Sequence, residues 1–141
     1  MPVEFVDTNV LVYAHDTSAG GKRRTAADLV LRIARARAGA ISIQVLLELF
    51  VVVTRKIQRP LNAAQAKEIV SDLSFWRVHA PDLRDVKEAL RISEDYRISV
   101  WDAMIIQSAI AEGASVLWTE DLNDGQEYAG VLVRNPFATA A

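Results

Sequence analysis

The 141-residue sequence contains no cysteine, which excludes a disulfide framework and metal sites of the zinc-finger type. It also lacks any apolar run near the roughly 18 residues that a membrane-spanning helix needs. Residues 1–4 have neither the charged nor the apolar region of a signal peptide. Internal repeats, linkers and low-complexity segments are missing as well. We therefore expect a cytoplasmic protein with no membrane segment and a single domain over residues 1–141.

The residues that are present favour a folded domain with a sizeable core, because 51% of them are hydrophobic. A net charge of -2 argues against a protein that coats nucleic acid by bulk electrostatics. Basic residues nevertheless gather in residues 22–37 and 55–59. Such runs are usually solvated helix faces, but they would contact phosphates if the protein handles a polyanion.

Short apolar runs alternate with segments of helical periodicity, a pattern typical of βα units. The sequence therefore predicts an α/β fold, with a central parallel sheet of about five strands flanked by helices. We expect strands at residues 3–6, 40–43, 75–79, 116–118 and 131–133, and a frayed tail at residues 137–141. We expect helices at residues 22–38 (ended by Gly39), 42–55, 62–73, 82–96 and 103–111.

Three helix starts have recognisable capping residues. Ser42 can cap the second helix, and Asn62 with Gln65 three residues later resembles a capping box. Asp82, after a proline, opens the fourth helix.

An acid stands at or near the end of four apolar segments: Asp7, Glu48, Asp102 and Asp121. The carboxyl ends of parallel strands meet at one edge of a sheet, so these side chains are expected to lie close together. Clustered carboxylates repel one another unless a cation lies between them, and hard oxygen ligands select Mg²⁺ or Mn²⁺. The pattern predicts a site for metal-assisted phosphoryl chemistry.

Each acid also has an ordinary structural explanation. Asp7, followed by Thr8 and Asn9, can form a turn or cap a helix. In the functional interpretation, Thr8 and Asn9 orient the Asp7 carboxylate or a water bound to it.

Glu48 lies within the most apolar stretch of the chain, residues 45–53. Burying a lone carboxylate costs several kcal/mol unless it is paired or binds a metal. Arg55 or Arg59 could pair with it, or Glu48 could lie on a narrow exposed stripe. Because Ser42 and Glu48 are near the start of the same helix, the carboxylate can reach the edge of the sheet.

Asp102 and Asp121 have local alternatives too. Asp102 follows Ser99 at the spacing of a capping box, although the apolar helix that it opens must be largely buried. Asp121 lies in a polar loop, where Glu120 and Asp124 are rivals for any ligand role. Thr119 can hold a water or phosphate oxygen through its hydroxyl.

Other chemistries find little support. A glycine-rich phosphate loop, a zinc-protease helix motif and a serine nucleophile elbow are all missing. His15 and His79 could act as acid and base in a metal-free ribonuclease, but a surface or packing role suits each better.

Four segments of the chain resemble, in order, the acidic motifs of PIN-domain nucleases. They are residues 5–11, 42–48, 99–105 and 117–122. Within that family, the chain length and the loop at residues 119–125 followed by residues 134–137 are similar to the VapC toxins of toxin-antitoxin pairs.

The resemblance implies a PIN-like fold and an endoribonuclease that depends on one or two Mg²⁺ or Mn²⁺ ions. Asp7, Glu48, Asp102 and Asp121 would bind the metal, supported by Thr8, Asn9, Ser42 and Thr119. Many relatives carry another acid two residues after the first acid of the last motif, whereas here Asn123 takes that place and Asp124 follows. Asp124 is therefore an alternative fourth ligand.

The partners implied by the resemblance are an RNA substrate, a VapB-like antitoxin and a second copy of the chain. Three other functions remain open. They are a housekeeping RNA-processing nuclease, a phosphotransferase with Asp7 as nucleophile, and a catalytically silent module that binds RNA or protein.

Overall fold

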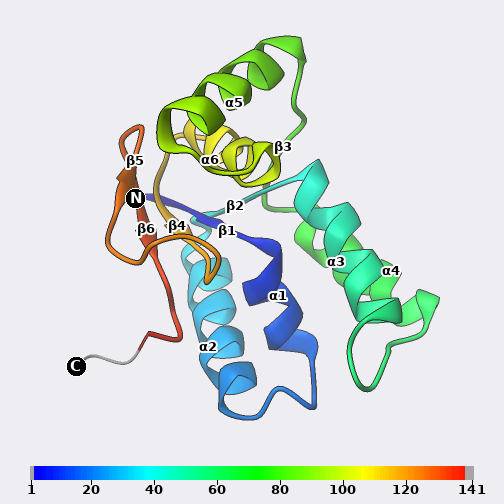
Figure 1. Ribbon diagram of the computed structural model, residues 1–141. Coiled ribbons are helices and arrows are strands. Elements are labelled where there is room, and N and C mark those ends of the chain that lie inside the picture. The colour runs from blue at the N-terminus through cyan, green and yellow to red at the C-terminus, as the bar shows by residue number, and fades with distance from the viewer. Residues whose placement is uncertain (1, 139–141) are drawn as a thin grey trace.

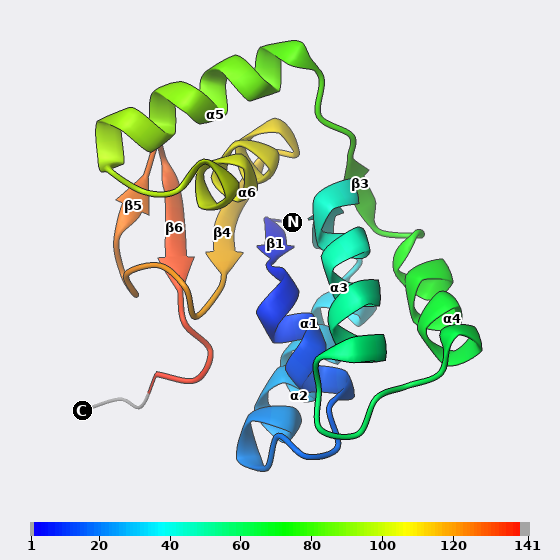
Figure 2. The same ribbon diagram turned by 45° about the vertical axis from the view of Figure 1, so that its right-hand side comes forward.

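The computed structural model describes residues 2–138 and has a six-stranded sheet with helices on both sides (Figure 1). The strand order is β3-β2-β1-β4-β6-β5, and every neighbouring pair is parallel except β5 with β6. Figure 2 shows β1, β4 and β6 pointing the same way and β5 pointing the opposite way. The predicted α/β fold with a mainly parallel central sheet is confirmed.

The strands are short and the helices longer. The strands are β1 (Val3–Val6), β2 (Gly39–Ser42), β3 (Arg77–His79), β4 (Ala114–Trp118), β5 (Glu127–Tyr128) and β6 (Val131–Arg134). The helices are α1 (Thr8–His15), α2 (Gly21–Ala36), α3 (Ile43–Arg55), α4 (Ala63–Leu73), α5 (Leu83–Tyr96) and α6 (Val100–Ala111).

The core lies between the sheet and helices on its two sides. α5 and α6 lie together on one side, while α1 and α2 lie together on the other (Figure 1). Phe5, Ile41 and Leu117, on the three central strands, are fully buried. β2 is buried along its whole length, as expected for a central parallel strand covered on both faces.

Capping at the three predicted helix starts is confirmed. The Ser42 hydroxyl accepts a hydrogen bond from the Val45 backbone N–H, at 3.2 Å. Asn62 and Gln65 form the expected capping box at the start of α4. Asp82 caps α5 and forms a capping box as well. These short-range bonds satisfy backbone donors that a helix start leaves free.

Two elements differ from the sequence prediction. Residues 8–15 form α1, which packs against α2 and α3. β5 is a sixth strand, joined to β6 by a tight turn in which Ala129 and Gly130 have φ angles of 50° and 89°. A two-residue strand is too short to produce a recognisable alternation of apolar residues.

Gly39 does not end a helix, contrary to the sequence prediction. α2 ends at Ala36, and Arg37 takes the left-handed conformation that was expected of a glycine, with φ of 53°. Gly39 instead lies in β2 with its backbone against the indole of Trp76, and a Cβ at this position would overlap that ring. A close approach of backbone to side chain, rather than backbone freedom, explains this glycine.

Buried hydrogen bonds fix α6 against β3 and α5. His79, at the end of β3, has Nδ1 2.8 Å from the Ser108 hydroxyl and Nε2 3.0 Å from Asp85 Oδ2. Gln107 donates to the other oxygen of Asp85 at 3.0 Å. Because Ser108 and Gln107 belong to α6, this network sets the position of the helix that carries Asp102.

The carboxyl-terminal segment is ordered further than expected. Phe137, the first residue of the predicted frayed tail, packs edge-on against Tyr13 with ring centroids 5.1 Å apart. Residues 139–141 of that tail lie outside the described residues. Within residues 2–138, none of the helices is both long and apolar enough to cross a membrane.

We predict that Gly39→Ala lowers the free energy of unfolding by about 1–3 kcal/mol, because the Trp76 ring must shift to admit a methyl group. Urea unfolding monitored by circular dichroism measures the change. Gly21→Ala is the matched control, since open space surrounds that position, and it is expected to be neutral or slightly stabilising. Equal stability of the two variants would contradict this account of Gly39.

Candidate active site

Asp7 is a buried carboxylate at the carboxyl end of β1, with a side chain that is 6% exposed. One oxygen accepts a hydrogen bond from the Thr8 backbone N–H at 2.7 Å, which caps α1. The other oxygen accepts from the Thr119 hydroxyl at 2.8 Å and from the Asn9 amide at 3.5 Å. The Asp7 carboxylate therefore caps α1 and is also part of the candidate site.

The pKa of Asp7 is raised to about 7, chiefly because burial removes the charged form from water. The hydrogen bonds from Thr119 and Thr8 oppose this shift, while the charges of Asp121 and Glu48 add to it. A cation next to Asp7 would relieve both the desolvation and the repulsion.

Glu48 lies on an exposed face of α3, which is the narrow exposed stripe that the sequence allowed as an alternative to burial. The apolar run spreads around the helix, and Leu47 is 65% exposed beside it. Glu48 still reaches the sheet edge, because its carboxylate accepts from the Thr8 hydroxyl at 3.0 Å and from the Gln44 amide at 2.9 Å. It pairs with neither Arg55 nor Arg59 among the described residues.

Asp102 is the third residue of α6 and is partly buried. Its backbone N–H donates to the Ser99 hydroxyl at 3.0 Å, which is one half of the predicted capping box. Its carboxylate does not complete the box within the described residues. Burial is the largest cause that raises the pKa of Asp102, and the charges of Asp121 and Glu48 raise it further.

The loop after β4 separates the three rival acids. Asp121 accepts a hydrogen bond from the Asn9 amide at 3.0 Å, which links it to Asp7. Glu120 instead accepts from the Tyr13 hydroxyl at 2.6 Å and pairs with Lys22 at 2.9 Å. Asp124 accepts from the Asn135 backbone N–H at 2.8 Å, just beyond β6. Asp121 is thus the member of this loop that lies with the other acids.

Asn9 and Thr119 connect the acids to one another. The Asn9 amide nitrogen donates to Thr119 at 3.1 Å, in addition to its bonds with Asp7 and Asp121. The buried Thr119 hydroxyl also accepts from the Asp121 backbone N–H at 3.1 Å. The orienting function expected of Asn9 agrees with these contacts. Ser42 has a different position, since its hydroxyl caps α3 and makes no contact with an acid among the described residues.

No pattern in the sequence pointed to the residues that hold Glu120. Tyr13 lies on α1, which was not predicted, and its ring also lies 4.7 Å from the Lys22 ammonium. Lys22 stood out only as one of many basic residues. Together they direct Glu120 away from the other four acids.

The four acids are coupled electrostatically and lack basic partners. In addition to burial, the negative charges of Glu48 and Asp121 raise the pKa of Asp7 and the pKa of Asp102. Within residues 2–138, no lysine, arginine or histidine forms an ion pair with any of the four. Within residues 2–138, no three histidine, cysteine, aspartate or glutamate side chains lie close enough together to hold a metal ion. Hard oxygen donors with uncompensated charge nevertheless fit a divalent cation of the Mg²⁺ or Mn²⁺ type.

These observations define an α/β protein with a group of acidic side chains at the carboxyl edge of a parallel sheet. The chain belongs to the PIN domain family, whose family model matches residues 5–128. Family membership, inferred from four acidic segments, is confirmed. The comparison with curated proteins found no match.

Solved structures share this fold. A toxin-antitoxin complex from Klebsiella pneumoniae has a chain that is 20% identical, with a TM-score of 0.72, over 96% of this chain and 99% of that one. A DNA-bound VapBC from Salmonella typhimurium is 17% identical, with a TM-score of 0.65, over 96% and 99%. The Mycobacterium tuberculosis toxin VapC20, which cleaves the sarcin-ricin loop, is 17% identical, with a TM-score of 0.59, over 81% and 86%. At such identities the likeness establishes the fold.

The raised pKa of Asp7 predicts a loss of stability as pH increases. Its pKa is about 7 in the folded protein and about 3.9 in the unfolded chain, so between these values only the folded state holds the proton. The free energy of unfolding should therefore fall by about 3 kcal/mol between pH 5 and pH 8 because of Asp7. Asp7→Asn removes this contribution and flattens the dependence.

Urea unfolding at the two pH values in EDTA measures the effect. Asp28→Asn is the matched control, because Asp28 is an exposed acid on α2. Parallel pH dependences for Asp7→Asn and the unsubstituted protein would contradict a buried, neutral Asp7 below pH 7.

Proposed function

We propose that this protein is a divalent-metal-dependent endoribonuclease and the toxin of a toxin-antitoxin pair. The observation that carries the proposal is the mutual repulsion of Asp7, Glu48, Asp102 and Asp121 at one sheet edge, with no basic partner among residues 2–138. Family membership and the likeness to VapC20 support an RNA substrate. The likeness to toxin-antitoxin complexes supports a VapB-like antitoxin as partner and the cytoplasm as compartment.

In this proposal the four acids hold one or two Mg²⁺ or Mn²⁺ ions. A bound ion would supply positive charge against the scissile phosphate and lower the pKa of an attacking water. Water adds to phosphorus and the bond to the 3′ oxygen breaks, so the products carry a 5′-phosphate and a 3′-hydroxyl. The protein contributes position: Thr8 orients Glu48, and Asn9 with Thr119 orients Asp7 and Asp121.

Asp121 is the fourth ligand that we propose, in preference to Asp124. Asn9 connects Asp121 to Asp7, whereas Asp124 is engaged with the backbone after β6. Asp121→Asn should therefore weaken binding of Mn²⁺, measured by calorimetry, more than Asp124→Asn does.

A homodimer is also part of the proposal, and exposed apolar residues beside the acids support it. Ile43, Leu47 and Val51 lie along one face of α3 and are 43%, 65% and 42% exposed. Val100 and Trp101, at the start of α6, are 41% and 69% exposed. Exposed apolar surface of this kind commonly marks a protein interface.

Cleavage of a defined RNA by the purified protein is expected to require Mg²⁺ or Mn²⁺ and to stop in EDTA. Asp102→Asn should lower the cleavage rate at least about 100-fold, because it removes a charged group of the site. Asp28→Asn, an exposed acid outside the site, should cleave at the unsubstituted rate. Circular dichroism must show that both variants are folded.

Cleavage that persists in EDTA would contradict the metal-dependent mechanism. Trapping of a phosphorylated Asp7 would instead favour a phosphotransferase. A chain that binds RNA without cleaving it, and that ignores both EDTA and Asp102→Asn, would be a silent binding module. Rapid cleavage that no antitoxin inhibits would favour a housekeeping nuclease.

The dimer has its own test. Leu47→Glu places a charge on the exposed face of α3 and should convert a dimer to a monomer in light scattering coupled to size exclusion. Leu83→Glu is the matched control, since Leu83 is 68% exposed on α5. A monomeric unsubstituted protein, or equal dissociation by both variants, would contradict this interface.

A further inference from the structure

A pocket lies at the amino ends of β2 and β3, at the edge of the sheet opposite the acids. It has a volume of about 490 Å³, which is in the range of small-ligand sites. Gly39 and Arg77, the first residues of β2 and β3, line it, together with Arg37, Asp72, Phe75 and Trp76. Asp7, Glu48 and Asp121 come after the other ends of β1, β2 and β4, and a four-residue strand such as β2 is roughly 13 Å long.

The floor of this pocket is preformed. Trp76 is half-buried against the core, and its indole fills the space that a side chain at position 39 would take. The ring is therefore fixed in place by backbone contact. A preformed site binds a ligand with less loss of conformational entropy than a site that must order itself.

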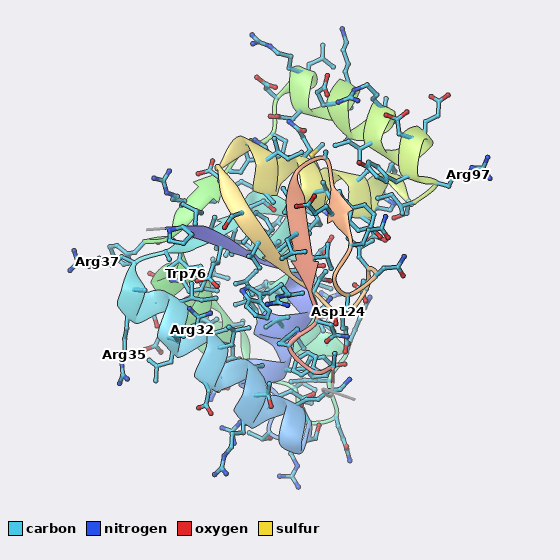
Figure 3. The ribbon with its side chains drawn as sticks, turned by 90° about the vertical axis from the view of Figure 1, so that its left-hand side faces the viewer. Arg32, Arg35, Arg37, Trp76, Arg97 and Asp124 are labelled. Carbon is cyan, nitrogen blue, oxygen red and sulfur yellow. The ribbon has the colours of Figure 1, made fainter. Side chains whose placement is uncertain are left out.

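Two arginines give the pocket positive charge. Arg37 and Arg77 are exposed, and neither forms an ion pair with any residue in the described part of the chain. Arg32, nearby on α2, differs because Glu4 neutralises it through two hydrogen bonds, at 2.9 and 3.1 Å. Figure 3 shows Arg37 beside Trp76. Free guanidinium groups match the geometry of a phosphate.

Phe75 supplies an aromatic face next to these charges. It is 89% exposed, the most exposed of the large hydrophobic side chains in residues 2–138. Such a ring beside free guanidinium groups is the combination that binds unpaired nucleotides, because the base stacks on the ring while the phosphate contacts arginine. Asp72 is the one acid that lines the pocket. Because its carboxylate repels phosphate, the phosphate is expected to bind on the side of the pocket formed by the two arginines.

We propose that this pocket binds an unpaired nucleotide of single-stranded RNA, with the phosphate on Arg37 and Arg77 and the base on Phe75. The site goes beyond the proposed nuclease activity, since binding here requires no metal and no cleavage. Its function is to hold a segment of RNA away from the acids.

The test is binding of a fluorescein-labelled, unstructured 12-nucleotide RNA to the unsubstituted protein in EDTA, followed by fluorescence anisotropy. Arg37→Asn with Arg77→Gln should weaken binding at least about tenfold at 50 mM salt and reduce the log-log salt slope by about 1.4. Phe75→Ala should weaken binding about tenfold and leave the slope unchanged. Asparagine suits the left-handed conformation at position 37, so the helix end is preserved.

Arg97→Asn is the matched control. Arg97 ends α5 in the same left-handed conformation, with φ of 55°, and Figure 3 shows it far from Arg37. If each arginine only stabilised the negative end of its helix, substitution of Arg37 and of Arg97 would lower stability equally. Neither substitution would then change RNA binding. Unchanged RNA binding in the Arg37/Arg77 and Phe75 variants would overturn the proposal.

Two further outcomes bear on the ligand. Binding of AMP as tightly as the 12-mer would assign the pocket to a free mononucleotide instead of RNA. Equal binding of a 12-residue polyglutamate would assign it to an acidic peptide. Because all measurements are made in EDTA, RNA binding that depends on Arg37 and Arg77 supports this site even where no cleavage is found.

Discussion

Parallel pairing of β1 with β2 and β4 is the constraint on which the candidate site depends. It brings the ends of three strands to one edge. Asp7 and Thr119, which follow β1 and β4, therefore lie near Ser42, the last residue of β2, although the three are far apart in sequence. The loops after these strands then have fixed starting points. Asn9 and Asp121 meet at 3.0 Å across 112 residues for this reason. A change in strand register would therefore separate the acids even if every side chain were kept.

Burial of Asp7 determines how negative charge is held at that edge. The carboxylate loses most of its contact with water, yet within residues 2–138 it receives hydrogen bonds only from neutral donors, Thr8, Thr119 and Asn9. Neutral donors orient a carboxylate without cancelling its charge, whereas an arginine would do both. Glu120 shows the contrast, because Lys22 neutralises it in the same loop. Glu120, which lies outside the group of four acids, thus has a basic partner, whereas the four acids form no ion pair within residues 2–138.

Sequence patterns predicted best what depends on nearby residues. Asn62 with Gln65, and Ser42 with Val45, are recognisable because capping joins residues three apart. The four acids were predicted because they follow apolar runs, and parallel strands bring such positions to one edge of the sheet. The burial of Glu48 stayed open because hydrophobicity does not show which helix face is covered, and α3 leaves Leu47 and Glu48 exposed. Gly39 against Trp76, and Tyr13 with Glu120, are contacts between distant segments that no local pattern encodes.

The distribution of charge matters more here than its total. With a net charge of -2, the chain as a whole does not attract a polyanion, so attraction must arise locally. At the carboxyl edge of the sheet, the unpaired acids would repel RNA until a cation joins them. At the amino edge, neither Arg37 nor Arg77 forms an ion pair with a residue in 2–138, while Arg32 is neutralised by Glu4. The sheet therefore has the acids at its carboxyl edge and positive charge at its amino edge. RNA that contacts both edges would be held by the arginines at the amino edge. It would be cut at the carboxyl edge only when a metal ion is bound to the acids.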